Sequence, residues 1–305
     1  MCGAYHASVP ISEHRVSGGS PELPSQSPQN LIMPDQISPE PPELTLCGSS
    51  TVPASLARVP EVTVLFWIIK VLTTGMGETT SDFLAHTLDP VLAVGIGGVC
   101  FVAALVLQFS RKRYIPWVYW LAVVMVSVFG TMAADVLHVG LGIPYAVSSV
   151  FYAVVLTLVF LAWKRVEGTL SIHSVYTRRR EAFYWAAVLA TFALGTAVGD
   201  LTAVTLHWGY LGSGILFATA IAIPALAHWK LGLNPILAFW AAYILTRPLG
   251  ASFADWMGVS HARGGLGWGT GLVSIGWSMA IVALVAILAT RKPRQVSLST
   301  ANFMP

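Results

Sequence analysis

A tryptophan and an aspartate fifteen positions apart recur four times in this sequence, and this repeat constrains the fold more than any other feature. A Phe or Tyr precedes each tryptophan, and a glycine stands five residues before each aspartate. The pairs are Trp67 with Asp82, Trp120 with Asp135, Trp185 with Asp200, and Trp240 with Asp255. A chain with such a repeat is built from copies of one supersecondary unit, so the four aspartates are expected at equivalent places.

Long apolar segments follow one another from Val62 onward. Each is close to the ~20 residues that a helix needs to cross a ~30 Å hydrocarbon core. The eight segments are 62–80, 90–109, 115–137, 143–163, 183–206, 211–230, 235–257 and 268–290. Charged residues make up 10% of the chain, well below the roughly 25% of a soluble domain. We therefore predict an all-α polytopic membrane protein with eight transmembrane helices.

The eight helices group into four repeats of two. Each repeat contains one outgoing and one returning helix, so the four copies are parallel and a pseudo-symmetry axis is expected along the membrane normal. The repeats cover about 62–116, 117–168, 183–234 and 235–290, within a membrane domain of residues 61–290. The widest spacing between repeat tryptophans includes the loop 168–182, which favours a two-plus-two arrangement of the repeats.

The two ends of the chain differ from this domain in composition. Residues 1–60 hold ten of the eighteen prolines and have no apolar run, so we expect a disordered, Pro-rich cytoplasmic tail. Residues 291–305 are expected to form a second cytoplasmic tail. The net charge of +3 is too small to indicate a nucleic-acid partner.

Basic residues mark one side of the membrane. They cluster after the even-numbered segments, at Arg111–Arg113, Lys164 and Arg165, Arg178–Arg180, Lys230, and Arg291, Lys292 and Arg294. The positive-inside rule then places both termini in the cytoplasm, for a multi-pass protein of the inner (plasma) membrane. Because the four repeat tryptophans lie on the same side, we interpret Trp67, Trp120, Trp185 and Trp240 as interfacial anchors.

The four aspartates are the main candidates for a functional site. Fifteen residues of helix, at ~1.5 Å per residue, place each aspartate ~22 Å from its tryptophan and past the bilayer midplane. A carboxylate there is costly in lipid, so we expect the four to face the bundle interior. If they converge, their oxygens would suit Mg²⁺, Mn²⁺ or Ca²⁺. Hydrogen bonds that only lock helices together are the alternative interpretation.

Histidines follow the aspartates at three to seven positions, one in each repeat: His86, His138, His207 and His261. Imidazole with carboxylate would extend the ligand set toward transition metals, or would supply a proton relay. Loop or interfacial residues without a ligand role are the alternative interpretation for these four side chains.

The first repeat departs from the others at Glu78, which shares a helix face with Asp82. Two carboxylates so close in a low dielectric do not readily both ionise unless a cation lies between them, so this pair is a candidate ion or proton site. Lys70 and Arg247 lie within apolar segments and are expected to balance the charge of buried acids. Five acids against two bases favour a cationic substrate.

The Trp-(x9)-Gly-(x4)-Asp frame, present in all four copies, resembles a family of bacterial integral membrane proteins with four tandem repeats of unknown function. In that family each repeat has two transmembrane segments and a characteristic tryptophan, matched here by Trp67, Trp120, Trp185 and Trp240. The resemblance covers residues 62–290. It implies the topology and carries no established activity.

These features favour a transporter or exporter of a small cation, a divalent metal or a proton-coupled ion, that uses Glu78, Asp82, Asp135, Asp200 and Asp255. The expected partners are the lipid bilayer and that cation. We expect no cofactor beyond a bound cation of unspecified identity, and the sequence leaves the oligomeric state open. The alternatives are a membrane enzyme acting on a lipid or quinone, for which no nucleophile–base motif is present, and a structural or assembly protein.

Overall fold

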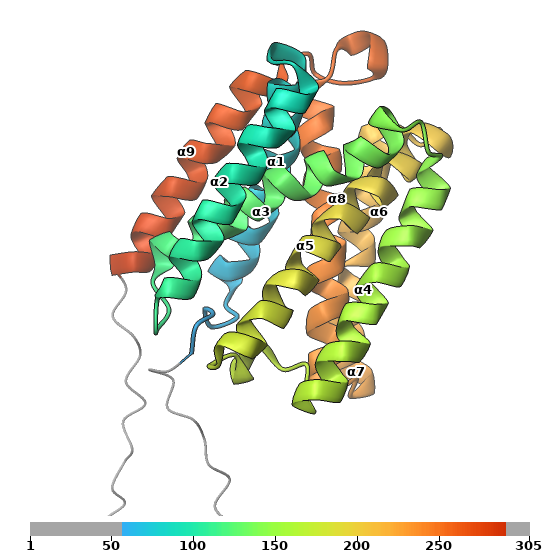
Figure 1. Cartoon of the computed structure of the whole chain (residues 1–305). Helices are drawn as coiled ribbons and strands as arrows, with labels where there is room; N and C mark the ends of the chain where they lie inside the picture. Colours follow the sequence, from blue (N-terminus) through green and yellow to red (C-terminus); the bar gives the residue numbers. More distant parts are fainter. Residues whose placement is uncertain (1–56, 291–305) are drawn as a thin grey trace, which may run out of the picture. The chain divides into compact units, whose positions relative to one another are not determined.

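Every regular element of the part of the chain that the structure describes, residues 57–290, is helical (Figure 1). The structure is a computed structural model. Its nine α-helices are α1 (Val64–Thr87), α2 (Pro90–Ser110), α3 (Pro116–Asp135), α4 (Tyr145–Glu167), α5 (Arg178–Asp200), α6 (Gly209–Ala220), α7 (Ala222–Leu231), α8 (Pro235–Gly258) and α9 (Thr270–Thr290). The predicted tails lie outside the described residues, apart from residues 57–60 of the first.

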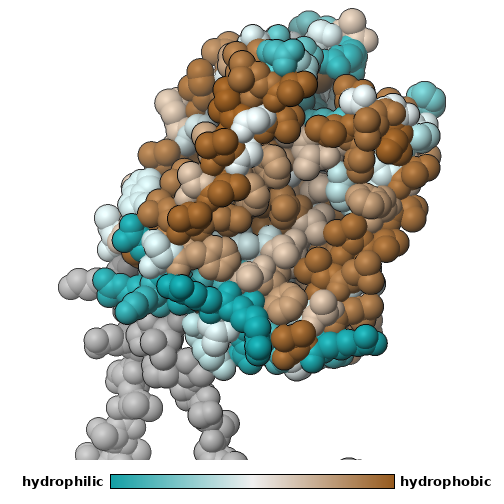
Figure 2. Space-filling view, in the orientation of Figure 1, coloured by the Kyte–Doolittle hydropathy of each residue, from teal (hydrophilic) through white to brown (hydrophobic). Residues whose placement is uncertain are grey.

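Seven of the helical stretches are long and apolar enough to cross a membrane, counting α6 and α7 as one. The eighth, α1, has a similar length but carries Lys70, Glu78 and Asp82. Figure 2 shows the corresponding surface, with hydrophobic side chains over the middle of the molecule and hydrophilic residues at both ends. The chain is therefore a helical membrane protein with seven to eight long apolar helices.

Local sequence signals set the helix ends. Asp89 caps α2 by accepting bonds from two backbone N–H groups, and Asn234 caps α8 in the same way with one. A proline follows each of these caps, at the first position of the helix, where a backbone N–H has no partner within the helix and its absence costs nothing. The predicted segment 211–230 is interrupted between α6 and α7, because Pro224 cannot bond to the carbonyl of Ala220, where α6 ends.

The first helices of the four repeats, α1, α3, α5 and α8, form a closed ring. Each packs against the next, and α8 packs against α1. The repeat glycines lie at these contacts: a Cβ on each would collide with the residue eight positions before the aspartate of the next repeat. The pairs are Gly77 with Ser127, Gly130 with Phe192, Gly195 with Arg247, and Gly250 with Thr74. Close helix approach in a membrane requires such small residues.

The second helix of each repeat packs mainly on the first helix of the following repeat. Thus α2 packs on α3, α4 on α5, α6 with α7 on α8, and α9 on α1. The Ser274 hydroxyl of α9 donates to Thr79 of α1 over 2.9 Å at the contact that closes the circle. The inner helices therefore form one continuous ring, which differs from the expected two-plus-two arrangement. Each repeat depends on its neighbour for burial.

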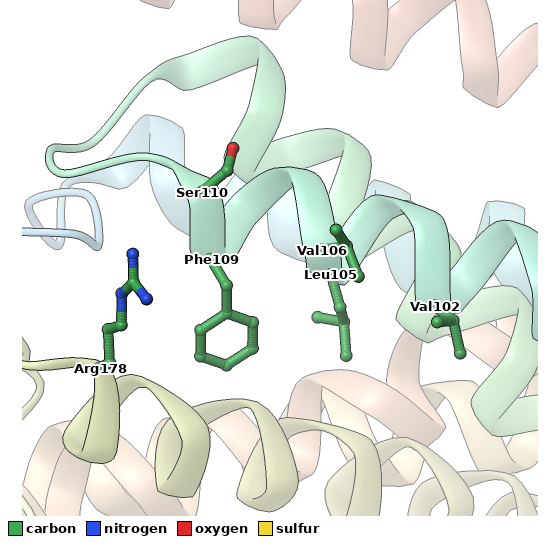
Figure 3. Close-up of a pocket in the computed structure, with 6 residues that line it drawn as sticks. All are labelled: Val102, Leu105, Val106, Phe109, Ser110 and Arg178. Atoms are coloured by element: carbon green, nitrogen blue, oxygen red, sulfur yellow. The ribbon is translucent and has the colours of Figure 1, made fainter.

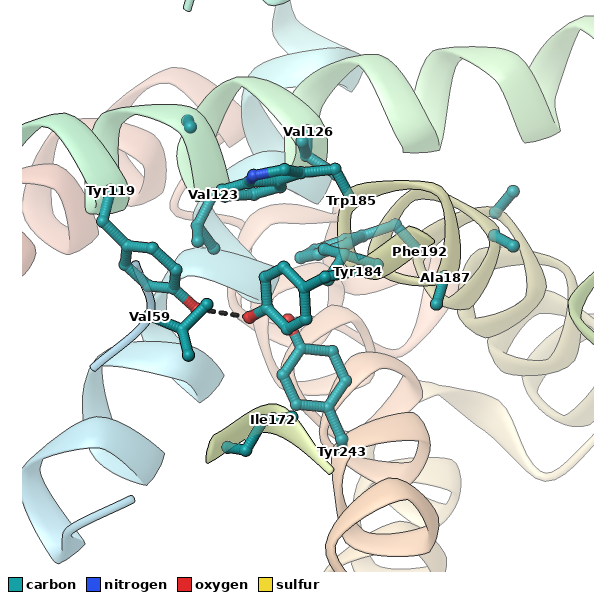
Figure 4. Packing of buried hydrophobic residues seen from close by; sticks show 14 of the residues in the cluster. Val59, Tyr119, Val123, Val126, Ile172, Tyr184, Trp185, Ala187, Phe192 and Tyr243 are labelled. Carbon is teal, nitrogen blue, oxygen red and sulfur yellow. Dashed lines mark hydrogen bonds between the residues drawn. The ribbon is translucent and has the colours of Figure 1, made fainter. Parts of the chain in front are cut away.

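An aromatic cluster fills the ring at the end where the basic residues lie. Trp120, Trp185 and Trp240 are buried, and Trp67 is partly buried beside Phe66. Figure 4 shows Tyr119 and Tyr184 meeting through their hydroxyls, with Trp185 and Tyr243 close by. Three of the four repeat tryptophans thus pack helices together in the core, and their rings do not face lipid as surface anchors would.

Candidate cation site

The ring carries its four aspartates at the end away from the aromatic cluster, because each lies fifteen residues along an inner helix. Asp135 ends α3 and Asp200 ends α5, and the chain continues from each as a short π-helix, Val136–Gly140 and Leu201–Thr205. In the first and fourth repeats the α-helix continues past the aspartate. π-Helical turns are rare and frequently lie at functional sites.

His138 lies within the first of these π-helices and joins the two aspartates. Its Nε2 is 3.0 Å from Oδ1 of Asp135 and 3.5 Å from Oδ2 of Asp200. The imidazole is buried and packs on the ring of Tyr145, with 4.7 Å between the ring centroids. The two carboxylates keep 29% and 20% of their side-chain surface exposed, so an ion can reach them.

These three residues form a set that could hold a metal ion. One ligand atom from each of Asp135, His138 and Asp200 lies within 4.8 Å of the other two. Two carboxylates and one imidazole suit Mn²⁺, Fe²⁺ or Zn²⁺ better than a set of carboxylates alone would. The Nδ1 of His138 is buried and has no hydrogen-bond partner within residues 57–290.

The other two aspartates flank this set. Asp82 is partly exposed, and the like charges of Glu78 and Asp135 lie near enough to repel its carboxylate. Asp255 is buried near the like charges of Glu78, Asp82 and Asp200, and its Oδ1 atom has no partner among the described residues. Four aspartate carboxylates therefore lie at one end of the ring. Within residues 57–290, His138 is the one basic side chain that pairs with any of them.

Glu78 lies one helical turn deeper and is already paired. Its Oε2 accepts a bond of 2.7 Å from Arg247. The hydroxyls of Thr131 and Thr196, which occupy the same repeat position as Glu78, donate to this oxygen over 3.2 and 3.3 Å. Arg247 also contacts both threonines and donates to the carbonyl of Thr74 over 3.0 Å. The carboxylate and guanidinium thus link all four inner helices at the centre of the ring.

Lys70 lies deeper still, toward the aromatic cluster, and pairs with no acid of residues 57–290. Its Nζ is 4.1 Å from the ring centroid of Phe192 and 4.4 Å from that of Tyr243. The amine is buried and makes no hydrogen bond to the described residues. Cation–π contacts are therefore its main polar interactions, and Arg247 is the base that meets Glu78.

The other three repeat histidines lie apart from the set of Asp135, His138 and Asp200. His86 is exposed and bonds to the backbone carbonyl of Asp82, and His261 is exposed and bonds to that of Gly265. His207 is exposed, with a left-handed backbone. Tyr145 and Tyr210 lie near the aspartates, although nothing in the repeat pattern marks them. Both stand near the start of a second helix, which is the one signal that could have found them.

All four copies of the repeat match one family model, described as a Repeat of Unknown Function, at residues 65–114, 118–169, 183–232 and 238–293. The chain belongs to the DUF347 family. Each DUF347 repeat matched here contains one helix of the inner ring and the helix that packs on the next repeat. No curated protein and no solved structure matches the sequence. The DUF347 family has no activity in its description.

Proposed function

We propose that this membrane protein transports a small cation, a divalent metal ion in particular, through a site made by Asp135, Asp200 and His138. The observation that carries the proposal is the convergence of these three ligand atoms within 4.8 Å. Asp82 and Asp255 add negative charge beside it and serve as further ligands or proton acceptors. The excess of acids at one end of the ring favours a cation over an anion.

The layers along the ring support alternating access to this site. The exposure of Asp135 and Asp200 leaves the cluster open at its own end. On the other side, the ion pair of Glu78 with Arg247 and then the aromatic cluster close the ring. Transport to the opposite side requires both layers to part, and we infer that loosening of the Glu78–Arg247 pair accompanies this step.

Protons are the coupling ion in this proposal. A carboxylate cannot hold a proton and a metal ion on the same oxygen, so proton uptake displaces the metal and metal binding releases protons. With the basic end of the molecule in the cytoplasm, as the positive-inside rule implies, the aspartates face the outer half of the inner membrane. A pH gradient would then drive release or uptake of the cation at that side.

Ion flux in proteoliposomes tests the proposal. Wild-type protein is compared with Asp200→Asn and Asp135→Asn for Mn²⁺, Mg²⁺, Ca²⁺, Zn²⁺, Na⁺ and K⁺ under an imposed pH gradient. Asparagine keeps the size of aspartate but removes the charge, so we expect flux of one ion to fall about tenfold or more. Calorimetric titration of the detergent-solubilised protein with that ion should show the same loss of binding.

Asp89→Asn is the matched control. Asp89 is exposed and caps α2, and asparagine caps a helix equally well, so this substitution removes a carboxylate outside the cluster. Its flux should equal that of the wild type. An absence of flux for every ion in the wild type, or equal losses in all three variants, would overturn the proposal and favour a structural role for the aspartates.

A further inference from the structure

A shallow groove lies at the basic end of the bundle, on the surface between α2 and the start of α5. Its volume is about 470 Å³. Figure 3 shows its walls: a row of side chains along α2 on one side and Arg178 rising from α5 on the other. The lining residues are Val102, Leu105, Val106, Phe109, Ser110 and Arg178. Helices α2 and α5 belong to different repeats, and beneath the groove they are joined by a buried hydrogen bond of 2.8 Å from the Gln108 amide to Glu181.

The α2 side of the groove is a continuous apolar stripe. Val102, Leu105, Val106 and Phe109 are spaced so that they share one helix face, and the stripe is ~10 Å long. Val102 and Val106 are 56% and 64% exposed, whereas Leu105 and Phe109 are partly buried against the core, so the outer edge of the stripe is open. In a membrane such a surface contacts acyl chains.

Arg178 gives this stripe a charged end. It stands beside Phe109 and Ser110, at the cytoplasmic end of the groove under the proposed orientation (Figure 3). The next two arginines both bond to Glu167, whereas Arg178 is exposed and makes no ion pair with residues 57–290. A basic run, Arg111–Arg113, follows Ser110 directly in the chain. The groove thus combines an apolar stripe, which suits an acyl chain, with a positive charge at the depth of the lipid headgroups.

We propose that this groove binds one anionic phospholipid, with an acyl chain along the α2 stripe and the phosphate on Arg178. A free phosphate would make no contact with the apolar stripe. A zwitterionic lipid has no net charge, so the surrounding basic residues would attract it less than an anionic lipid. The bound lipid would bridge a second helix of the first repeat and the first helix of the third. This site is independent of the cation site and of transport.

Native mass spectrometry of the purified protein tests the site. The detergent-solubilised chain is titrated with equal amounts of phosphatidylglycerol and phosphatidylethanolamine that have identical acyl chains. Wild-type protein should bind one phosphatidylglycerol in preference to phosphatidylethanolamine. Arg178→Gln should weaken that binding about fivefold, the effect of one basic residue near an anionic headgroup.

Two controls separate this site from general attraction to the basic surface. Arg165→Gln removes the same charge from an exposed arginine of α4 at the same end of the molecule and should leave binding unchanged. Val106→Trp fills the groove and should abolish the preference, whereas Val154→Trp, at an exposed position of α4, should not. Equal effects of the two arginine variants, or of the two tryptophan variants, would overturn the proposal, as would equal binding of both lipids.

Discussion

Glu78 and Arg247 illustrate how single residues break the symmetry of the repeat. Three repeats carry Glu78, Thr131 and Thr196 at one position, and these side chains meet at Arg247 from the fourth. A buried ion pair is costly to desolvate, and its attraction offsets that cost only with good geometry and further hydrogen bonds. The threonines supply such bonds to the Glu78 carboxylate and to Nη2 of Arg247, while the buried Nε of Arg247 has no partner among residues 57–290.

Removing one partner of this pair should destabilise the protein strongly. Glu78→Gln leaves Arg247 as a buried charge without its counterion, at an expected cost of ~3–5 kcal/mol. Thermal unfolding in detergent, followed by tryptophan fluorescence, measures the change. Glu61→Gln is the matched control because Glu61 is exposed. The double variant Glu78→Gln with Arg247→Gln should lose less than the sum of the single changes, and strict additivity would contradict the coupling.

His138 differs from the other repeat histidines in its contacts, and this difference predicts a functional asymmetry. If the proposed metal site is correct, His138→Gln should weaken metal binding about tenfold or more, because it removes the imidazole of the set. His86→Gln should have no effect, since that imidazole bonds to a backbone carbonyl on the exposed surface. Titration calorimetry with the metal measures both variants. Equal affinities would place His138 outside the ligand set.

At the scale of helices, the repeat glycines explain why the inner helices form so tight a ring. Each glycine meets the next inner helix at a point where a Cβ has no room. Two glycines of the outer helices are different: a Cβ at Gly276 of α9 or at Gly95 of α2 would have nothing within 4 Å. Glycine therefore has a packing role at the ring positions and none at these two.

Alanine substitutions should separate these two sets. Gly250→Ala places its Cβ 2.7 Å from the carbonyl oxygen of Val71 and against Thr74, and should cost ~1–3 kcal/mol of unfolding free energy through overpacking. Gly276→Ala should be neutral or stabilising by up to ~1 kcal/mol, because alanine is the better helix former. The melting temperatures of the two variants and of the wild type, measured in detergent, test this difference. An unchanged melting temperature for Gly250→Ala would argue against the closed ring.

For the whole molecule, the separation of basic residues from the aspartate cluster sets the expected orientation. The acidic end and the basic end lie at opposite ends of the inner helices, and the hydrophobic surface in Figure 2 lies between them. By the positive-inside rule, we expect a helical bundle with this charge asymmetry to insert with its basic loops in the cytoplasm.

Cysteine labelling in intact cells tests this orientation. In a background with Cys2, Cys47 and Cys100 replaced by serine, Ser260→Cys should react with a membrane-impermeant maleimide, because its loop is exposed at the aspartate end. Lys112→Cys should react only after the membrane is permeabilised. The opposite pattern would invert the topology and would move the cation site to the cytoplasmic side.

Most of the helices could be predicted from the sequence, since helix length and apolar composition are local properties. The predicted segment 90–109 and α2 agree closely. The break at Pro224 was missed because a span of the right length can contain a kink. The burial of Trp120, Trp185 and Trp240 was also missed, because a tryptophan near a helix end suits an interface and a core equally well.

The sequence by itself determined that four copies of one two-helix unit, each with an aspartate at the same depth, build a membrane protein, because repeats, hydropathy and spacing are written along the chain. Only the tertiary structure decided which copies cooperate. Arg247 meets Glu78 across 169 residues, and His138 rather than any other repeat histidine joins Asp135 and Asp200. These choices depend on how the helices close into a ring and on where π-helical turns redirect side chains, and neither follows from local propensity.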